Sequence, residues 1–281
     1  MNTMTLKLRR WMGFLGAHAI LVLAMIVALF PIVLVLMNSF KARKAIFRAP
    51  MLPPLPDTFS LDGYATVLQR SNFQLYFVNS LVVTLGSMAL ILLLGAMAAY
   101  ALSEYEFRGN AVLGIYLAIG IMIPIRLGTV SILRIMVAMK LVNTLTALIL
   151  VYIAMGLPLT IFILAEFMRQ VPRELKEAAR IDGASEYRIF WLILPLVRPA
   201  IATVAVFTMI PVWNDLWFPL ILAPGEKTKT VTLGAQQFLG QFVSDWNAVL
   251  SSLSLAMVPI LIIYIIFSRQ LIRGLTAGAV K

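Results

Sequence analysis

The chain has no cysteine and only one histidine, His18. Disulfide bonds, zinc–thiolate sites and thiol nucleophiles are therefore excluded, and neither a histidine-based metal cluster nor a Ser-His-Asp triad can be assembled. No stretch matches the G-x-x-x-x-G-K-[ST] phosphate loop, since the nearest approach, GEKT at residues 225–228, lacks the glycine spacing that directs backbone N–H groups at phosphates. We therefore expect no catalytic residue, no metal site and no cofactor on this chain.

Charged side chains are also scarce. They make up 12% of the 281 residues, whereas 61% are hydrophobic, and soluble domains carry about a quarter charged residues. Most of the chain must therefore face lipid, which an α-helix crosses with about 20 apolar residues. Six segments have this length and composition, and each must be helical because hydrocarbon leaves no partner for open backbone groups: 12–37, 75–102, 111–129, 145–167, 199–222 and 248–268.

These segments predict an all-α integral membrane protein with six transmembrane helices, built as a single domain over residues 1–281. Five segments contain a proline that removes a backbone donor and predicts a kink: Pro31, Pro124, Pro158, Pro211 and Pro259. The Pro-rich stretch 50–56 suits a surface loop. Apolar residues at 132, 135, 136 and 139 predict a short helix along the membrane surface.

The net charge of +11 does not indicate nucleic acid, because the 23 Lys and Arg residues lie in short connections between apolar runs. These connections suit contacts with lipid headgroups. The first apolar run is far too long for a cleaved signal peptide, so it is interpreted as the first helix. Basic residues favour cytoplasmic termini only weakly, since Lys41, Arg43, Lys44 and Arg48 would then lie outside.

Residues 171–198 form the only long polar interruption that is patterned like structured protein. Pro172 suits the first position of a helix, and Arg180 suits its C-terminal end. Gly183 supplies a stop, because glycine adopts a left-handed backbone without penalty, and Ser185 can cap a second helix. The pattern therefore predicts a helix-turn-helix between the fourth and fifth membrane segments.

On the first of these helices, Leu175, Ala178, Ala179 and Asp182 share a face that the two alanines make nearly flat. Such a surface is suited to docking into the groove of another protein. An ordinary loop at the membrane interface fits the pattern equally well, because charge-edged helical turns are common there.

The segment resembles the cytoplasmic loop of permease subunits of bacterial ABC importers, in particular the carbohydrate-uptake branch with the smaller permease of maltose-type systems. That loop carries E-A-A-x3-G followed by I-x-L-P, matched here by Glu177, Ala178, Ala179 and Gly183 and then by Ile193, Leu194 and Pro195. The second motif is one residue shorter here, which would turn all that follows in a helix by about 100°. The run at 212–222 and the tail at 269–281 extend the resemblance over essentially the whole chain.

The resemblance implies an inner-membrane permease with both termini cytoplasmic, working beside a second homologous permease subunit, an ATPase dimer that binds ATP and Mg²⁺, and an extracytoplasmic solute-binding protein. It implies that the loop seats its first helix in a cleft of the ATPase, with coupling residues Glu177, Ala178, Ala179, Asp182 and Gly183. The cytoplasmic tail would reach the interface between the two ATPase subunits.

Polar groups in membrane segments are costly and tend to face a cavity. Candidates for the solute pathway are Asn79, Trp213, Asn214 and Asp215, together with Arg126. Aromatic faces beside hydrogen-bonding groups suit a sugar ring, but tryptophans at helix ends usually belong to the interfacial belt. Both interpretations stay open for Asn214 and Asp215.

Two other classes of function fit the sequence less well. An ion-coupled secondary transporter would generally show carboxylates in mid-membrane and often internal repeats, and this chain has few such acids and no visible repeat. A membrane-embedded enzyme would need a cluster of catalytic acids, histidines or metal ligands, which the sequence lacks.

Overall fold

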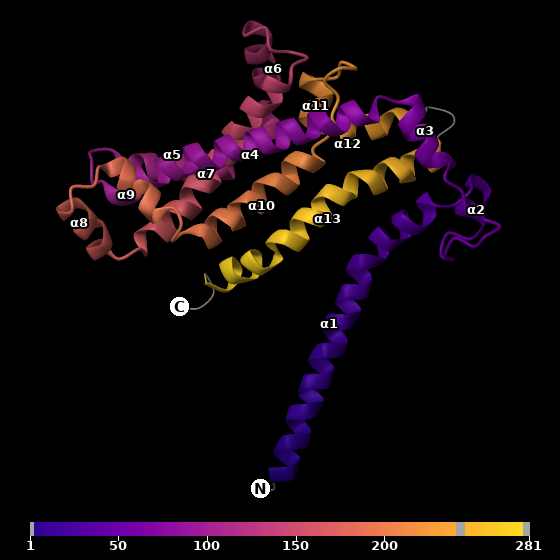
Figure 1. Ribbon diagram of the computed structural model, residues 1–281, viewed down its shortest axis with the longest axis horizontal. Helices are drawn as coiled ribbons and strands as arrows, with labels where there is room; N and C mark the ends of the chain where they lie inside the picture. Colours follow the sequence, from indigo (N-terminus) through magenta and orange to yellow (C-terminus); the bar gives the residue numbers. More distant parts are fainter. Residues whose placement is uncertain (1–2, 240–244, 278–281) are drawn as a thin grey trace. The chain divides into compact units, whose positions relative to one another are not determined.

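The computed structural model describes residues 3–239 and 245–277, and within them the regular structure is helical apart from one isolated bridge between Lys41 and Phe59. The predicted all-α fold is confirmed. The helices, which Figure 1 shows in chain order, are α1 Thr3–Ser39, α2 Arg43–Arg48, α3 Asp62–Arg70, α4 Phe73–Glu104, α5 Asn110–Met122, η1 Ile125–Gly128, α6 Thr129–Ala138, α7 Leu145–Arg169, α8 Arg173–Ile181, α9 Glu186–Ile193, α10 Arg198–Asn214, α11 Trp217–Leu222, α12 Val231–Ala235, η2 Gln236–Phe238 and α13 Trp246–Ala277.

The chain forms two compact units. One comprises Met1–Ser71 and Ala235–Leu255. Its polar centre is the buried ammonium of Lys41, which donates to Asn38 Oδ1 at 2.9 Å and to the carbonyl of Ala49 at 3.0 Å. Asn247 in turn donates to the carbonyl of Lys41 at 2.7 Å. Lys41, one of the basic residues that cytoplasmic termini would place outside, is therefore buried and links the end of α1 to the loop after α2.

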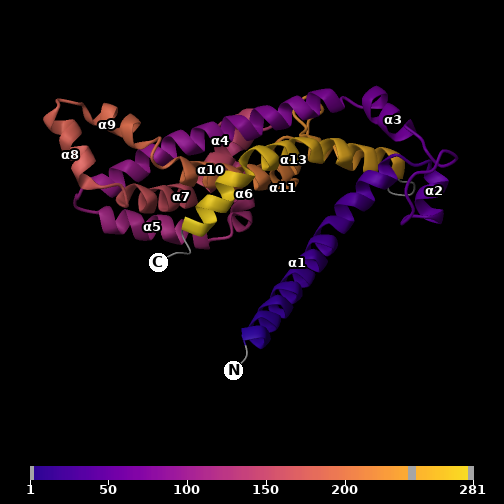
Figure 2. The ribbon, with the colours of Figure 1, turned by 60° about the horizontal axis from the view of Figure 1, so that its bottom comes forward.

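The other unit comprises Asn72–Gly234 and Ala256–Lys281. In it α4, α7 and α10 pack side by side, and α5 lies against α7 (Figures 1 and 2). Small residues permit the close approach of α4 and α7: a Cβ on Gly156 would lie 2.6 Å from Ile91, and one on Gly95 would collide with Thr160. Glycines at helix contacts are a common packing device in membranes, because lipid provides no hydrophobic drive for association.

The described residues hold three helices long and apolar enough to cross a membrane, or up to five if each of two bent pairs counts as one span. The three are Trp11–Ser39, Phe73–Glu104 and Leu145–Arg169, which contain the predicted segments 12–37, 75–102 and 145–167. The shorter apolar helix Trp246–Ile262 covers most of the sixth segment. Six transmembrane spans thus stay a prediction.

The predicted helix 111–129 is wrong as a continuous element, because the chain bends by 86° between α5 and η1–α6. Ile123 is extended, with φ −77° and ψ 120°, as expected of a residue before proline. The break therefore arises at Pro124, one of the predicted kinks. The predicted surface helix corresponds to α6, which ends one residue before Met139.

The predicted helix 199–222 is also interrupted, and not at its proline. Pro211 lies inside continuous α10, while Asp215 is extended, with φ −70° and ψ 133°. The carboxylate of Asp215 accepts hydrogen bonds from the backbone N–H groups of Trp217 and Phe218, both at 3.1 Å. Asp215 therefore starts the short α11 by satisfying donors that the first turn of a helix leaves open.

The predicted cytoplasmic tail 269–281 is helical as far as Ala277, since α13 continues nine residues beyond the predicted end at 268. Its last four residues, 278–281, lie outside the described part of the chain.

Candidate functional site

The helix-turn-helix is formed by α8 and α9, which lie at one end of the packed α4 and α7 (Figures 1 and 2). Gly183 has φ +77°. The N–H of Ala184 donates to the carbonyl of Ala179 at 2.9 Å, and the N–H of Gly183 donates to that of Arg180 at 3.0 Å. This pair of bonds is the Schellman arrangement, which satisfies the last carbonyls of a helix and requires a left-handed residue.

Two local predictions at this site need correction. Pro172 is the N-cap rather than the first helical residue, because α8 begins at Arg173. Ser185 does precede α9, but its hydroxyl makes no capping hydrogen bond.

The predicted docking face is divided by the structure. Glu177, Ala178 and Asp182 are exposed. Ala179 is half-buried and packs at the edge of the apolar core shared by α4, α7, α9 and α10. The exposed surface gains large apolar side chains that the sequence pattern did not single out, since 86% of Ile181 and 77% of Tyr187 is accessible.

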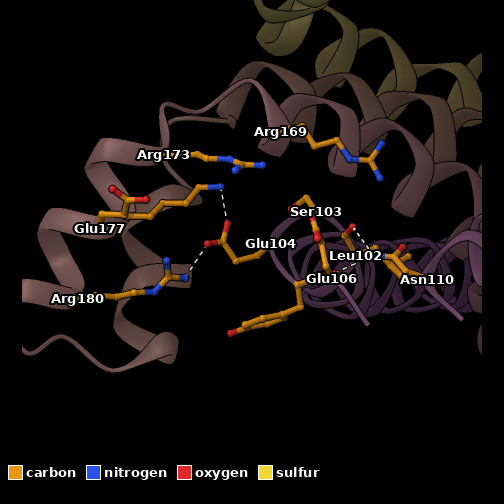
Figure 3. A pocket seen from close by; sticks show the side chains of 11 residues that line it. Leu102, Ser103, Glu104, Glu106, Asn110, Arg169, Arg173, Glu177 and Arg180 are labelled. Carbon is orange, nitrogen blue, oxygen red and sulfur yellow. Dashed lines mark hydrogen bonds and ion pairs between the residues drawn. The ribbon is translucent and has the colours of Figure 1, made fainter. Parts of the chain in front are cut away.

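A network of ion pairs holds α8 against the end of α4 (Figure 3). Glu104, the last residue of α4, receives the ammonium of Lys176 at 2.6 Å and the guanidinium of Arg180, also at 2.6 Å. Arg180 Nε contacts the carboxylate of Glu186 at 2.9 Å. Lys176 is buried, so its charge is removed from water and compensated by Glu104. Sequence reasoning missed this network.

Two tyrosines extend the network to α9. The hydroxyls of Tyr100 and Tyr105 both donate to Glu186 Oε2, at 2.9 and 2.8 Å. Hydrogen bonds to the carboxylates of Glu186 and Glu104 raise the pKa of Arg180, so its positive charge is permanent. The turn between α8 and α9 is thus held in one geometry by fixed charges as well as by its backbone.

A cavity of about 620 Å³ opens beside these ion pairs. Figure 3 shows Arg169 and Arg173 on one side and Glu106 and Asn110 on another, around the paired Glu104. The surroundings of α8 are therefore polar and water-accessible.

Three of the predicted solute-pathway residues donate hydrogen bonds to backbone carbonyls of the permease itself. Asn79 is buried, and its amide donates to the carbonyls of Lys227 and Lys229 at 3.0 and 2.9 Å. Trp213 is buried and donates to the carbonyl of Ala256 at 3.0 Å. Asn214 is exposed and donates to the carbonyl one turn earlier, that of Ile210. These contacts favour structural roles for all three.

Asp215 does line a cavity, one of about 240 Å³ between α4, α7, α10 and the two helix breaks. Tyr152 donates to its carboxylate at 2.9 Å, and the guanidinium of Arg126 lies 3.8 Å from it. Arg126 also lies over the ring of Trp217, whose indole N–H donates to Thr129 at 3.0 Å. Both interrupted helices therefore meet at this cavity and are fastened to each other there.

Comparison with known proteins decides the family. Residues 91–277 match the model of the family described as "Binding-protein-dependent transport system inner membrane component". The chain belongs to this family. As a permease of this kind it is a membrane component of an ABC importer, a transport system that uses a solute-binding protein and a separate ATPase subunit.

Several curated relatives are permeases of sugar systems. The permease is 33% identical, over 94% of its length and 88% of the relative's, to the diacetylchitobiose uptake system permease protein of Streptomyces coelicolor. It is 30% identical to the probable starch degradation products transport system permease protein of Thermoanaerobacterium thermosulfurigenes, over 89% of this chain and 91% of that one.

A solved structure shares the fold. It is a crystal structure of a bacterial ABC transporter involved in the import of the acidic polysaccharide alginate, with a TM-score of 0.77, 22% identity, and coverage of 92% of this chain and 96% of that chain. The family assignment does not support the alternative of ion-coupled secondary transport.

Proposed function

We propose that this permease is one membrane-spanning half of an ATP-driven importer for a sugar or oligosaccharide. The observation that carries the proposal is the exposed α8, fixed on its inner side by Glu104 and presenting Glu177, Ala178 and Asp182 outward, in a member of this transport family. The sugar class is supported by relatives that serve diacetylchitobiose and starch products.

The working complex has this permease beside a second, homologous one, with an ATPase dimer that binds ATP and Mg²⁺ and a binding protein on the outer side. The α8–α9 loop and both chain termini face the cytoplasm. The permease itself holds no cofactor.

Within the loop the coupling residues divide into two roles. Glu177, Ala178 and Asp182 contact the ATPase directly, helped by the exposed Ile181. Ala179 and Gly183 act without contacting the ATPase: Ala179 packs α8 on the core, and Gly183 shapes the turn.

The solute passes the cavity at the two helix breaks, with Asp215 and Arg126 as its polar groups. Irregular backbone at membrane depth is tolerated where it lines a cavity, and transporters commonly place substrate sites at broken helices. Apart from the hydroxyl-bearing Tyr152 and Thr208, the rest of the lining is apolar, with large side chains such as Phe207. That mixture suits a sugar ring, whose CH faces are apolar and whose hydroxyl groups need donors and acceptors.

The test is co-expression with the ATPase, the second permease and the binding protein, followed by uptake in liposomes. The sugar that co-purifies with the binding protein is the substrate to use. An active transporter formed by this polypeptide alone would contradict the proposal.

The cavity is tested with Arg126→Gln. This variant should raise the apparent KM for uptake several-fold and leave the affinity of the permease for the ATPase unchanged. The matched control is Arg134→Gln, an exposed arginine on α6. Equal KM values for both variants and wild type would remove Arg126 from the pathway.

Orientation can be tested because the chain has no cysteine. A single cysteine replacing Ile181, which is 86% exposed, should react with a membrane-impermeant maleimide only when the reagent has access to the cytoplasmic side. A cysteine replacing Phe59, in the loop before α3, is the control that should react from the outside.

A further inference from the structure

Glu104 joins two parts of the permease that lie far apart in the sequence. It is the last residue of α4, and its two carboxylate oxygens are taken by two cations of α8, Lys176 and Arg180, both at 2.6 Å (Figure 3). The side chain of Lys176 is 5% exposed and that of Glu104 is 10% exposed. The pair is therefore largely shielded from water. In such surroundings charge-assisted hydrogen bonds are strong, and the loss of one partner leaves an uncompensated charge.

The chain does not connect α8 directly to α4. Its N-terminal side follows α7, and its C-terminal side continues through α9 into α10. The ion pairs at Glu104 link α8 directly to α4. The hydrogen bonds of Tyr100 and Tyr105 with Glu186 link α9 to the same end of α4.

The middle of α4 borders the proposed solute cavity. Ile91 lines that cavity, and it lies 13 residues before Glu104, which is about 20 Å along an α-helix. An α-helix of this length transmits a displacement of its end, particularly when it is packed along α7 as α4 is.

We infer that Glu104 is a positioning residue that transfers the motion of α8 to α4, and through α4 to the cavity wall at Ile91. This inference rests on the proposed coupling role of α8. It adds a direct link from α8 to α4 beside the indirect one through α7, which leads into α8 and packs along α4. Without the pair, ATP hydrolysis still moves α8, but α4 follows incompletely, so fewer solute molecules cross per ATP.

The experiment uses the complete complex in liposomes and measures solute uptake and ATP hydrolysis together. Glu104→Gln keeps the size of the side chain and removes its charge, and Lys176→Met keeps the aliphatic stem and removes the ammonium. Both should lower the number of solute molecules transported per ATP at least several-fold, with unchanged affinity for the ATPase. The control is Glu106→Gln, an exposed acid at the same cavity, which should keep the wild-type ratio.

Rescue separates transfer of motion from a general loss of structure. The chain has no cysteine, so Glu104→Cys combined with Lys176→Cys offers one pair for a short bifunctional thiol reagent. The uncrosslinked pair should show the low ratio, and crosslinking should restore it toward the wild-type value.

A wild-type ratio in Glu104→Gln, or a crosslinked pair that stays uncoupled, would overturn the inference. Loss of ATPase binding in both single variants would also overturn it, because the network would then hold the loop's fold rather than transfer its motion. Failure of the proposed function is distinct, since it would appear in the wild-type complex as no ATPase binding or no uptake.

Discussion

Replacement of Gly183 by valine isolates the backbone requirement of the turn between α8 and α9. A Cβ built on Gly183 meets nothing within 4 Å, while its φ is +77°. A larger side chain therefore has space, and the penalty comes from the left-handed backbone alone. That penalty is about 1–2 kcal/mol for an ordinary L-residue, and a β-branched residue held in this region costs on the order of 1–3 kcal/mol.

Relief of that strain would open the Schellman turn and tilt α8 away from its docking geometry. A penalty of about 1–3 kcal/mol corresponds to roughly a 5- to 150-fold change in an equilibrium. The apparent affinity for the ATPase should fall by the same factor, since only the competent fraction of loops binds. Gly183→Asn is the matched variant, because asparagine visits the left-handed region routinely, and it should lose much less.

The assay titrates the purified ATPase onto the permease complex in nanodiscs and measures uptake with the same preparations. Membrane insertion and the helical CD signal serve as controls for folding. If valine and asparagine give the same affinity as glycine, the turn does not need a left-handed residue and the docking assignment of the loop fails.

Three further outcomes are expected. Ala178→Trp should overfill the ATPase groove and abolish uptake, whereas Glu177→Ala should matter least, because exposed ion pairs contribute only about 0–1 kcal/mol; the reverse order of uptake would contradict the docking face. Deletion of residues 276–281 should alter the stimulation of ATP hydrolysis but not the insertion of the permease into the membrane. Unchanged stimulation would contradict a contact between the tail and the ATPase. Hydrogen bonds from Lys229 and Tyr76 lower the pKa of Glu226 from 4.5 to about 2. Its stabilisation is thus complete above pH 4.5 and lost as the pH falls toward 2, so wild type and Glu226→Gln should converge in unfolding temperature upon acidification.

The sequence predicted features that depend on short-range chemistry. Apolar length identified α1, α4 and α7, the effect of proline on the preceding residue placed the break at Pro124, and the conformational freedom of glycine placed the turn at Gly183. In each case the signal lies within a few residues of the feature.

Features that depend on distant partners were missed or misjudged. Glu104 and Lys176 are 72 residues apart, so no local pattern indicates their pairing. One short-range signal was also missed: Asp215 was assigned to a continuous helix, although its side chain accepts hydrogen bonds from backbone N–H groups two and three residues on and so starts α11. Trp213 and Asn79 resembled solute ligands in composition, but their partners belong to α13 and to the loop at 227–229.

The ion pairs that hold α8 also bear on how the permease responds when the surrounding water acidifies. Histidine is the only side chain whose unperturbed pKa brings a change of charge between about pH 5 and 8, and the one histidine of this chain lies in α1 rather than among Glu104, Lys176, Arg180 and Glu186. The attachment of the loop therefore carries no built-in proton sensor. A shift between pH 8 and pH 5 should therefore leave these ion pairs in place, and any effect of pH on transport in that range would have to arise outside this network.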